Sequence, residues 1–195
     1  MSELERDIAT TVGASEIAAI LGQDPYRTAA DVWRSKVEGE RLELNEHMVR
    51  GICLENGLLD WWERLDGRKL ERRQKLFTSP NGWACATCDG VVSAHIVEVK
   101  CPVGGKAWDD RAQRFPFHYQ LQCVWQIGVA SDATGVQHTA ELCAGPVWGR
   151  LMRFPIQFDA ALFALMLERA EEFMAHVRAG TPLPPAFTSQ EAAHG

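Results

Sequence analysis

Two short segments near the middle of the chain constrain the fold most strongly. Val91-Val92 and the segment 96–100, Ile-Val-Glu-Val-Lys, are rich in β-branched residues, and the second alternates in polarity. Both properties are typical of β-strands. Further strands are expected at 135–142 and 147–156. Because helix-forming segments precede and follow them, the sequence predicts an α/β (α+β) fold in which helices flank a mixed central β-sheet.

Helix signals lie on both sides of these strands. A short helix is expected to begin at the cap Ser15 and to end at Gly22. The capping box Thr28-Ala-Ala-Asp31 predicts a second helix. Longer helices are expected from hydrophobic spacing and terminal residues at 47–65, 106–113, 117–129 and 159–178.

An acidic residue interrupts the apolar face of one of these helices. The predicted helix 47–65 carries an apolar stripe made of Met48, Ile52, Leu59 and Trp62. Glu55 lies in the middle of that stripe. A buried carboxylate without a partner is unfavourable. Glu55 is therefore either paired with an arginine or part of a functional site.

Asp89 and Glu98 are two further acids in unusual positions. If a hairpin turns at Ser93-Ala94, residues 89 and 98 are directly opposite each other. Opposed side chains have Cβ atoms roughly 5 Å apart, and two like charges there destabilise a sheet. Lys100 lies two residues after Glu98 and therefore on the same face. The register stays open, because Ser-Ala is not a strong turn sequence.

Two carboxylates and a lysine at one point suit phosphodiester hydrolysis. A divalent cation removes the repulsion between the acids, and Mg²⁺ prefers hard oxygen ligands. Such a cation polarises a phosphoryl oxygen and activates water. The ammonium of Lys100 can position or deprotonate that water and stabilise developing charge. The spacing alone leaves a simple ion pair between Lys100 and Glu98 as the alternative.

Five segments occur in one order that resembles a known family of nucleases. They are Gly13–Gly22, Arg50-Gly-x-x-x-Glu55, Cys88-Asp-Gly90, Glu98-Val-Lys-Cys-Pro102 and Gln120-Leu-Gln122. Together they resemble the lambda-exonuclease (YqaJ-type viral recombinase) family of PD-(D/E)xK nucleases over roughly residues 10–130. The resemblance implies a restriction-endonuclease-like core and a Mg²⁺-dependent enzyme, with Mn²⁺ as a substitute. Such an enzyme digests linear double-stranded DNA from a 5′ end and leaves a 3′ single strand.

The resemblance also implies roles for individual residues. Catalysis would involve Glu55, Asp89, Glu98 and Lys100, of which Lys100 would serve the nucleophilic water. The metal would be held by Glu55, Asp89, Glu98 and the Val99 carbonyl. Contacts to phosphate and DNA would come from Ser15, Thr87, Gln120, Gln122 and Arg50. A helix N-terminus at Ser15 suits a phosphate independently of the family. The family often has an arginine seven positions before this serine, where the present chain has Ile8.

Charge and cysteine content limit the alternatives. The net charge of −6 argues against a protein that coats nucleic acid through bulk positive charge. The basic run 68–75 could follow a DNA backbone or form a solvated surface. Six cysteines include only one close pair, Cys85 and Cys88, so reduced thiols are expected, with an iron–sulfur cluster as the alternative.

The remaining expectations concern organisation and partners. A single nuclease domain is expected over residues 1–180, followed by a loose tail at 181–195. Without an apolar leader or spanning segment, the expected location is the cytoplasm of a bacterial host, with a phage or prophage origin. The family implies double-stranded DNA ends, a homotrimer ring and a single-strand annealing protein as partners. An endonuclease or repair nuclease and a non-catalytic DNA-end-binding module remain as rival functions.

Overall fold

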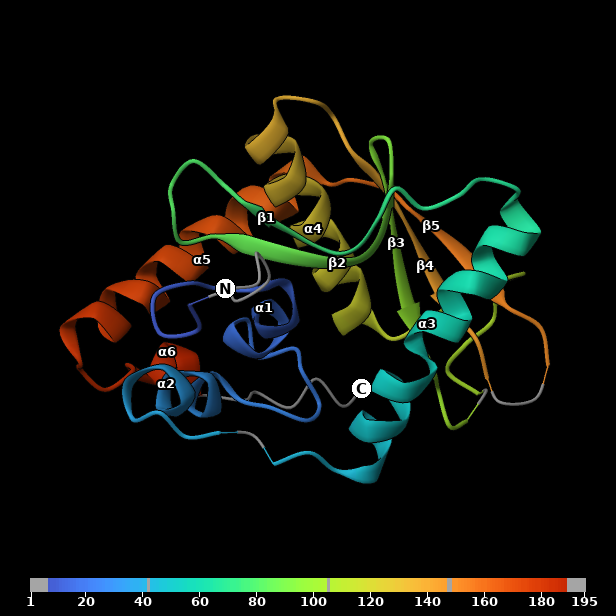
Figure 1. The fold of residues 1–195 in the computed structure, drawn as a ribbon. Helices are drawn as coiled ribbons and strands as arrows, with labels where there is room; N and C mark the ends of the chain where they lie inside the picture. Colours follow the sequence, from blue (N-terminus) through green and yellow to red (C-terminus); the bar gives the residue numbers. More distant parts are fainter. Residues whose placement is uncertain (1–6, 42, 105, 147–148, 189–195) are drawn as a thin grey trace.

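The centre of the molecule is a mixed five-stranded β-sheet (Figure 1). The computed structural model describes residues 7–41, 43–104, 106–146 and 149–188. β3 and β4 run parallel and the other neighbouring strands run antiparallel. The strands lie in chain order: β1 Arg72–Thr78, β2 Cys85–Val92, β3 His95–Lys100, β4 Thr139–Ala144 and β5 Met152–Ile156. The predicted mixed sheet is therefore confirmed.

Helices cover both faces of the sheet (Figure 1). One face packs against α3 (Glu46–Asp66) through a smaller apolar cluster. The opposite face carries the larger core, built with α1 Ala14–Ile20, α2 Ala29–Val37, α4 Phe117–Thr134, α5 Ala160–Ala179 and α6 Pro185–Thr188. None of the described helices is long and apolar enough to cross a membrane.

The alternation of β3 divides its side chains between these two cores. Ile96 belongs to the core with α4, whereas Val97 and Val99 pack with α3. Successive strand residues point to opposite faces of the sheet. Glu98 consequently faces α4, and the residues on either side of it face α3.

The start of α1 differs from the expectation. The N-cap is Gly13 rather than Ser15, and the backbone N–H of Gly13 donates to the Glu16 carboxylate at 2.9 Å. Glu16 also forms a buried ion pair with Lys36, at 3.0 Å. Because the capping partner is supplied by Glu16, Ser15 is left exposed in the first turn. The predicted end of the helix is confirmed, since Gly22 has a φ of +68°.

The helix α3 confirms the segment predicted at 47–65 but buries only half of the expected stripe. Its N-cap Asn45 accepts the Met48 N–H at 3.0 Å, and the helix ends at Gly67 with a φ of +86°. The buried residues all lie in its second half, whereas Ile52 is 59% exposed. The first turns extend beyond the end of β3 (Figure 1), where no sheet is available to cover them.

Two other segments also differ from their predictions. Residues 106–113 form turns instead of a helix, and backbone hydrogen bonds of 2.8 Å join Asp109 and Arg114 in both directions. The strands expected at 135–142 and 147–156 begin later, as β4 and β5. Part of the second prediction, residues 147–148, lies outside the described residues.

The end of the chain is more ordered than expected up to residue 188. The prediction of a loose tail from 181 is wrong for α6, because Phe187 is buried and contacts Phe173 with ring centroids 5.9 Å apart. Arg169 also lies over the Phe187 ring, at 3.9 Å from its centroid. Apolar burial therefore holds this turn against α5, whereas residues 189–195 lie outside the described residues.

Candidate active site

The site begins where the β2–β3 hairpin loses its regular pairing. The turn lies at Ser93-Ala94, as predicted, and backbone pairing extends as far as Gly90 and Val97. Two residues further along β3, the Val99 N–H donates to Asp89 Oδ2 at 2.9 Å rather than to a carbonyl of β2. The predicted register, which places residue 89 opposite residue 98, is therefore confirmed, but the regular backbone pairing ends one position earlier, at Gly90 and Val97.

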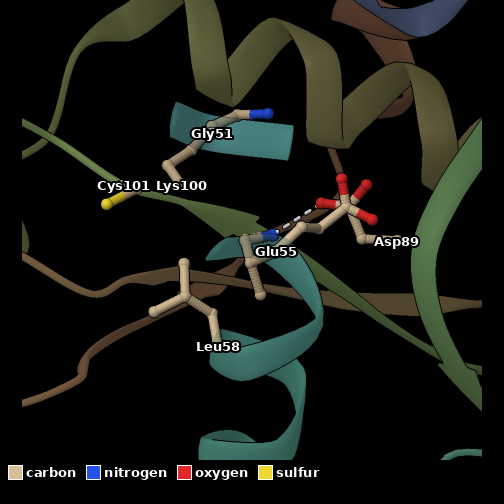
Figure 2. Close-up of a pocket in the computed structure, with 7 residues that line it drawn as sticks. Gly51, Glu55, Leu58, Asp89, Lys100 and Cys101 are labelled. Atoms are coloured by element: carbon tan, nitrogen blue, oxygen red, sulfur yellow. Dashed lines mark hydrogen bonds between the residues drawn. The ribbon is translucent and has the colours of Figure 1, made fainter. Parts of the chain in front are cut away.

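A cavity of about 150 Å³ lies beside the end of this pairing, between the hairpin and α3. Figure 2 shows the Glu55 and Asp89 carboxylates reaching the same side of this cavity. The lining residues come from α3, from β2 and from the end of β3: Gly51, Glu55, Leu58, Asp89, Val99, Lys100 and Cys101. Acids that are 34 positions apart in the sequence are therefore brought together by the fold.

A glutamine from β1 joins the two acids. Gln74 Nε2 donates to Glu55 Oε1 and, at 3.4 Å, to Asp89 Oδ1. An amide nitrogen carries two hydrogens, so one group can serve both carboxylates. The amide supplies no full charge, and the two negative groups remain close together.

Glu98 is turned away from the cavity, towards α4. Its side chain is 1% exposed and forms an ion pair with Lys100. Two glutamines of α4 complete its coordination, with Gln122 Nε2 at 2.5 Å and Gln126 Nε2 at 2.7 Å. The carboxylate therefore holds the lysine in place and is itself fixed by three donors.

Burial and neighbouring charge shift the titration of the site. Burial raises the pKa of Asp89 well above its usual value, and the charge of Glu98 raises it further. Burial opposes the charge on Lys100, but Glu98 and Asp89 outweigh this effect and raise its pKa. Lys100 is therefore held as an ammonium, and its Nζ lies 5.4 Å from the centroid of the Tyr119 ring.

The residues around the cavity fit a hydrated divalent cation. Within the described residues, no three His, Cys, Asp or Glu side chains gather closely enough to hold a metal ion by themselves. Mg²⁺ usually keeps several waters and binds through one or two carboxylates. Glu55 and Asp89 are two carboxylates that line the cavity and could bind such an ion, and Val99 also lines it. Glu98, by contrast, is occupied by Lys100 and α4.

The predicted phosphate contacts are not gathered into one cluster by hydrogen bonds. Ser15 is exposed on α1, and Thr87 and Gln120 are half-buried on β2 and α4. Across the part of the chain that the structure describes, no hydrogen bond joins these three side chains. Gln122 binds Glu98 instead, and Arg50 Nη2 donates to the Cys101 carbonyl at 2.5 Å.

Sequence reasoning missed two residues of the site, Gln74 and Gln126. Gln126 could have been found, because it lies four residues after Gln122 and therefore on the same helical face. Gln74 lies inside the basic run 68–75 and offers no comparable local signal. Its role depends on the pairing of β1 with β2.

Most of the charge of the basic run is paired. Arg68 binds Asp66, Lys69 binds Glu63 at 2.7 Å, and Arg73 binds Asp60. These carboxylates belong to the second half of α3. The run therefore joins β1 to α3 through three of its five positive charges.

The cysteines near the site are buried thiols. Burial and the charge of Glu98 raise the pKa of both Cys88 and Cys123 well above its usual value. A raised pKa disfavours the thiolate that metals and electrophiles require. All six cysteines are free of disulfides.

The architecture and the cavity together define the class of the protein. The fold is shared with solved structures of exonucleases. The chain is similar to an alkaline exonuclease (LHK-Exo) from Laribacter hongkongensis, with 22% identity, a TM-score of 0.69 and coverage of 88% of this chain and 90% of that chain. A phage-related exonuclease from Haemophilus somnus 129PT is similar over 87% and 94% of the two chains, with 14% identity and a TM-score of 0.66. The fold is thus restriction-endonuclease-like.

The family follows from the sequence itself. Residues 6–137 match the YqaJ-like viral recombinase domain, and the chain belongs to this family. A putative exonuclease from Eubacterium rectale shares the fold at 12% identity, with a TM-score of 0.61 and coverage of 90% of this chain and 84% of that chain. No curated protein sequence matches the chain.

Proposed function

We propose that this protein is a Mg²⁺-dependent exonuclease that hydrolyses linear double-stranded DNA from the 5′ end and leaves a 3′ single strand for phage-type recombination. The observation that carries the proposal is the cavity lined by Glu55, Asp89 and Lys100. Family membership and the exonuclease folds that the chain resembles support the same activity. Mn²⁺ is expected to substitute for Mg²⁺.

The residues in and around the cavity have different roles in the proposed hydrolysis. Glu55 and Asp89 would hold the cation, which would supply positive charge to polarise the phosphoryl group. Lys100 donates from its ammonium to the attacking water or to a phosphoryl oxygen, which stabilises developing negative charge. Glu98 is a positioning residue, because it fixes the Lys100 ammonium through an ion pair.

The proposed assembly is a homotrimer ring around a duplex DNA end, which works with a single-strand annealing protein in the bacterial cytoplasm. Ser15, Thr87 and Gln120 are proposed to meet the 5′-phosphate. Light scattering coupled to gel filtration should give three times the chain mass of 21.7 kDa. A mass of one chain at all concentrations would contradict the ring.

The direct test is digestion of labelled linear duplex DNA. We expect rapid loss of a 5′ label when the end carries a phosphate and Mg²⁺ is present, and no loss in EDTA. A closed circular duplex should be spared. Cleavage of the circle would indicate an endonuclease, and binding of ends without any cleavage would indicate a non-catalytic module.

The roles of the acids and the lysine are tested by substitution. Asp89→Ala and Lys100→Ala should each lower the cleavage rate by about 10²-fold or more, because the first removes a proposed ligand of the cation and the second removes a positive charge that stabilises developing negative charge. Lys100→Ala should leave Mn²⁺ binding, measured by calorimetry, largely intact. Glu168→Ala, at an exposed site on α5, is the matched control and should cleave normally. Either site variant cleaving at the wild-type rate would contradict the assignment.

A further inference from the structure

Gln74 occupies an unusual position in β1. It lies between the register pairs Arg73–Gly90 and Lys75–Cys88, and is therefore opposite Asp89. Its φ of +52° falls in the left-handed region, which residues other than glycine rarely adopt. Such conformations persist where the surrounding structure holds them, and they gather at functional sites.

The contacts of Gln74 explain where its side chain is held. Its amide nitrogen donates to Glu55 and, at 3.4 Å, to Asp89, the two acids that face the cavity. Both acceptors come from other elements, α3 and β2. The amide therefore stands between two carboxylates that would otherwise repel each other across a partly buried space.

We infer that the Gln74 amide is a neutral placeholder for the divalent cation, which displaces it on binding. This inference rests on the proposed function, because it assumes that Glu55 and Asp89 hold the cation. An N–H group and a cation both bind to carboxylate oxygens, so they compete for the same atoms. An N–H group directed at a cation is also repelled by it. The two cannot occupy the space between the acids together.

Two consequences follow from this competition. The amide stabilises the metal-free protein, because it is the hydrogen-bonding partner shared by both carboxylates. It also weakens cation binding, because its hydrogen bonds must break first. Removing the amide should therefore lower the stability of the metal-free protein and tighten the binding of the cation.

The first test is Gln74→Met, which keeps the length of the side chain but removes its hydrogen bonds. In EDTA, the melting temperature should fall by a few degrees, as expected for loss of hydrogen bonds to charged groups. Calorimetric titration with Mn²⁺ should give a dissociation constant about threefold to tenfold lower than that of the wild type. Neither measurement depends on DNA cleavage.

The second test is Gln74→Lys, which places a tethered ammonium between the acids. In EDTA this variant should melt at a higher temperature than the wild type. It should bind Mn²⁺ at least about tenfold more weakly, because the ammonium cannot be diluted away from the site. Mn²⁺ binding with wild-type affinity would show that Gln74 is not at the cation position.

Gln113→Met is the matched control. Gln113 also has a left-handed φ, of +50°, and is exposed, with its amide donating to the Asp110 carbonyl instead of a site carboxylate. Its Mn²⁺ affinity should equal that of the wild type.

The outcomes separate the two proposals. Absence of Mn²⁺ binding by the wild-type protein would overturn the metal site and, with it, this inference. If the wild type binds Mn²⁺ but Gln74→Met binds it equally well or more weakly, the placeholder role alone is overturned.

Discussion

The carboxylate of Glu98 is surrounded by donors that come from two different elements. Lys100 of β3 and the two glutamines Gln122 and Gln126 of α4 all reach it. Gln126 is fully buried and also donates to the Thr87 carbonyl at 3.2 Å. A buried carboxylate needs such partners, because each missing one leaves desolvation uncompensated.

Loss of one of these donors should lower the stability of the folded protein. Gln126→Met should lower the free energy of unfolding by about 1–3 kcal/mol, because Glu98 stays buried with one partner fewer. Urea denaturation measures this directly. Gln23→Met, at an exposed position, should change stability by less than about 0.5 kcal/mol. Equal effects of the two variants would show that Gln126 does not support Glu98.

The sequence indicates the reactive residues better than their orientation. Glu55 is conspicuous because it interrupts an apolar stripe, and Glu98 and Lys100 because they share a strand face. Alternation places Glu98 and Lys100 on one face of β3, but which face meets α3 and which meets α4 depends on how the helices pack. The hydrogen bond from the Val99 N–H to Asp89 is also a contact that no strand periodicity encodes.

At the scale of elements, α3 has two unequal halves. Its second half is anchored by Leu58, Leu59 and Trp62, while its first half has no fully buried residue. The hydrogen bond from Arg50 to the Cys101 carbonyl fastens this first half to the chain just after β3. Glu55 stands near the boundary between the halves, so its placement depends on that fastening.

Hydrogen exchange should reveal this dependence. Arg50→Met should accelerate amide exchange by about tenfold over residues 46–54, because a hydrogen bond from a charged group is lost. Exchange over residues 58–66 should stay unchanged. Arg64→Met, in the exposed part of the second half, is the control and should alter neither region. Uniform acceleration along the whole helix would contradict two unequal halves.

Elements were predictable where local signals agree with packing. The long helices and the strand at 96–100 have both periodicity and terminal residues, and they are found as expected. The segment 106–113 packs into the core through Trp108, but the backbone pair between Asp109 and Arg114 folds it into turns, so its helical composition does not decide its conformation. At α1, the reciprocal bond between Gly13 and Glu16 replaces the expected serine cap.

At the scale of the whole molecule, an ion network joins the end of α3 to β5. Asp66 binds Arg68 and, at 2.8 Å, Arg153. The hydrogen bond from Arg68 lowers the pKa of Asp66 to about 2, with further help from Arg153. A carboxyl whose pKa is lower in the folded state stabilises the fold above its unfolded pKa, near 4, and this contribution is lost as the pH falls towards 2.

Removing this carboxylate should produce a pH-dependent loss. Asp66→Asn should reduce the free energy of unfolding by about 1 kcal/mol at pH 7, a modest value because water screens the arginines. The difference from the wild type should vanish as the pH approaches 2. Denaturant titrations at several pH values measure it, with Glu168→Gln as a control. A difference that persists unchanged at low pH would exclude an ionic origin.

The two walls of the cavity differ in how well they tolerate substitutions. One wall, at β2 and β3, is continuous with the sheet that both cores cover, so almost any substitution there disturbs the interior. The other wall is the less supported end of α3, where neighbouring positions point into solvent. Among natural or engineered variants of this chain, substitutions should therefore be more frequent in α3 than in the sheet. Substitutions in α3 can change the affinity for the ion without changing the sheet.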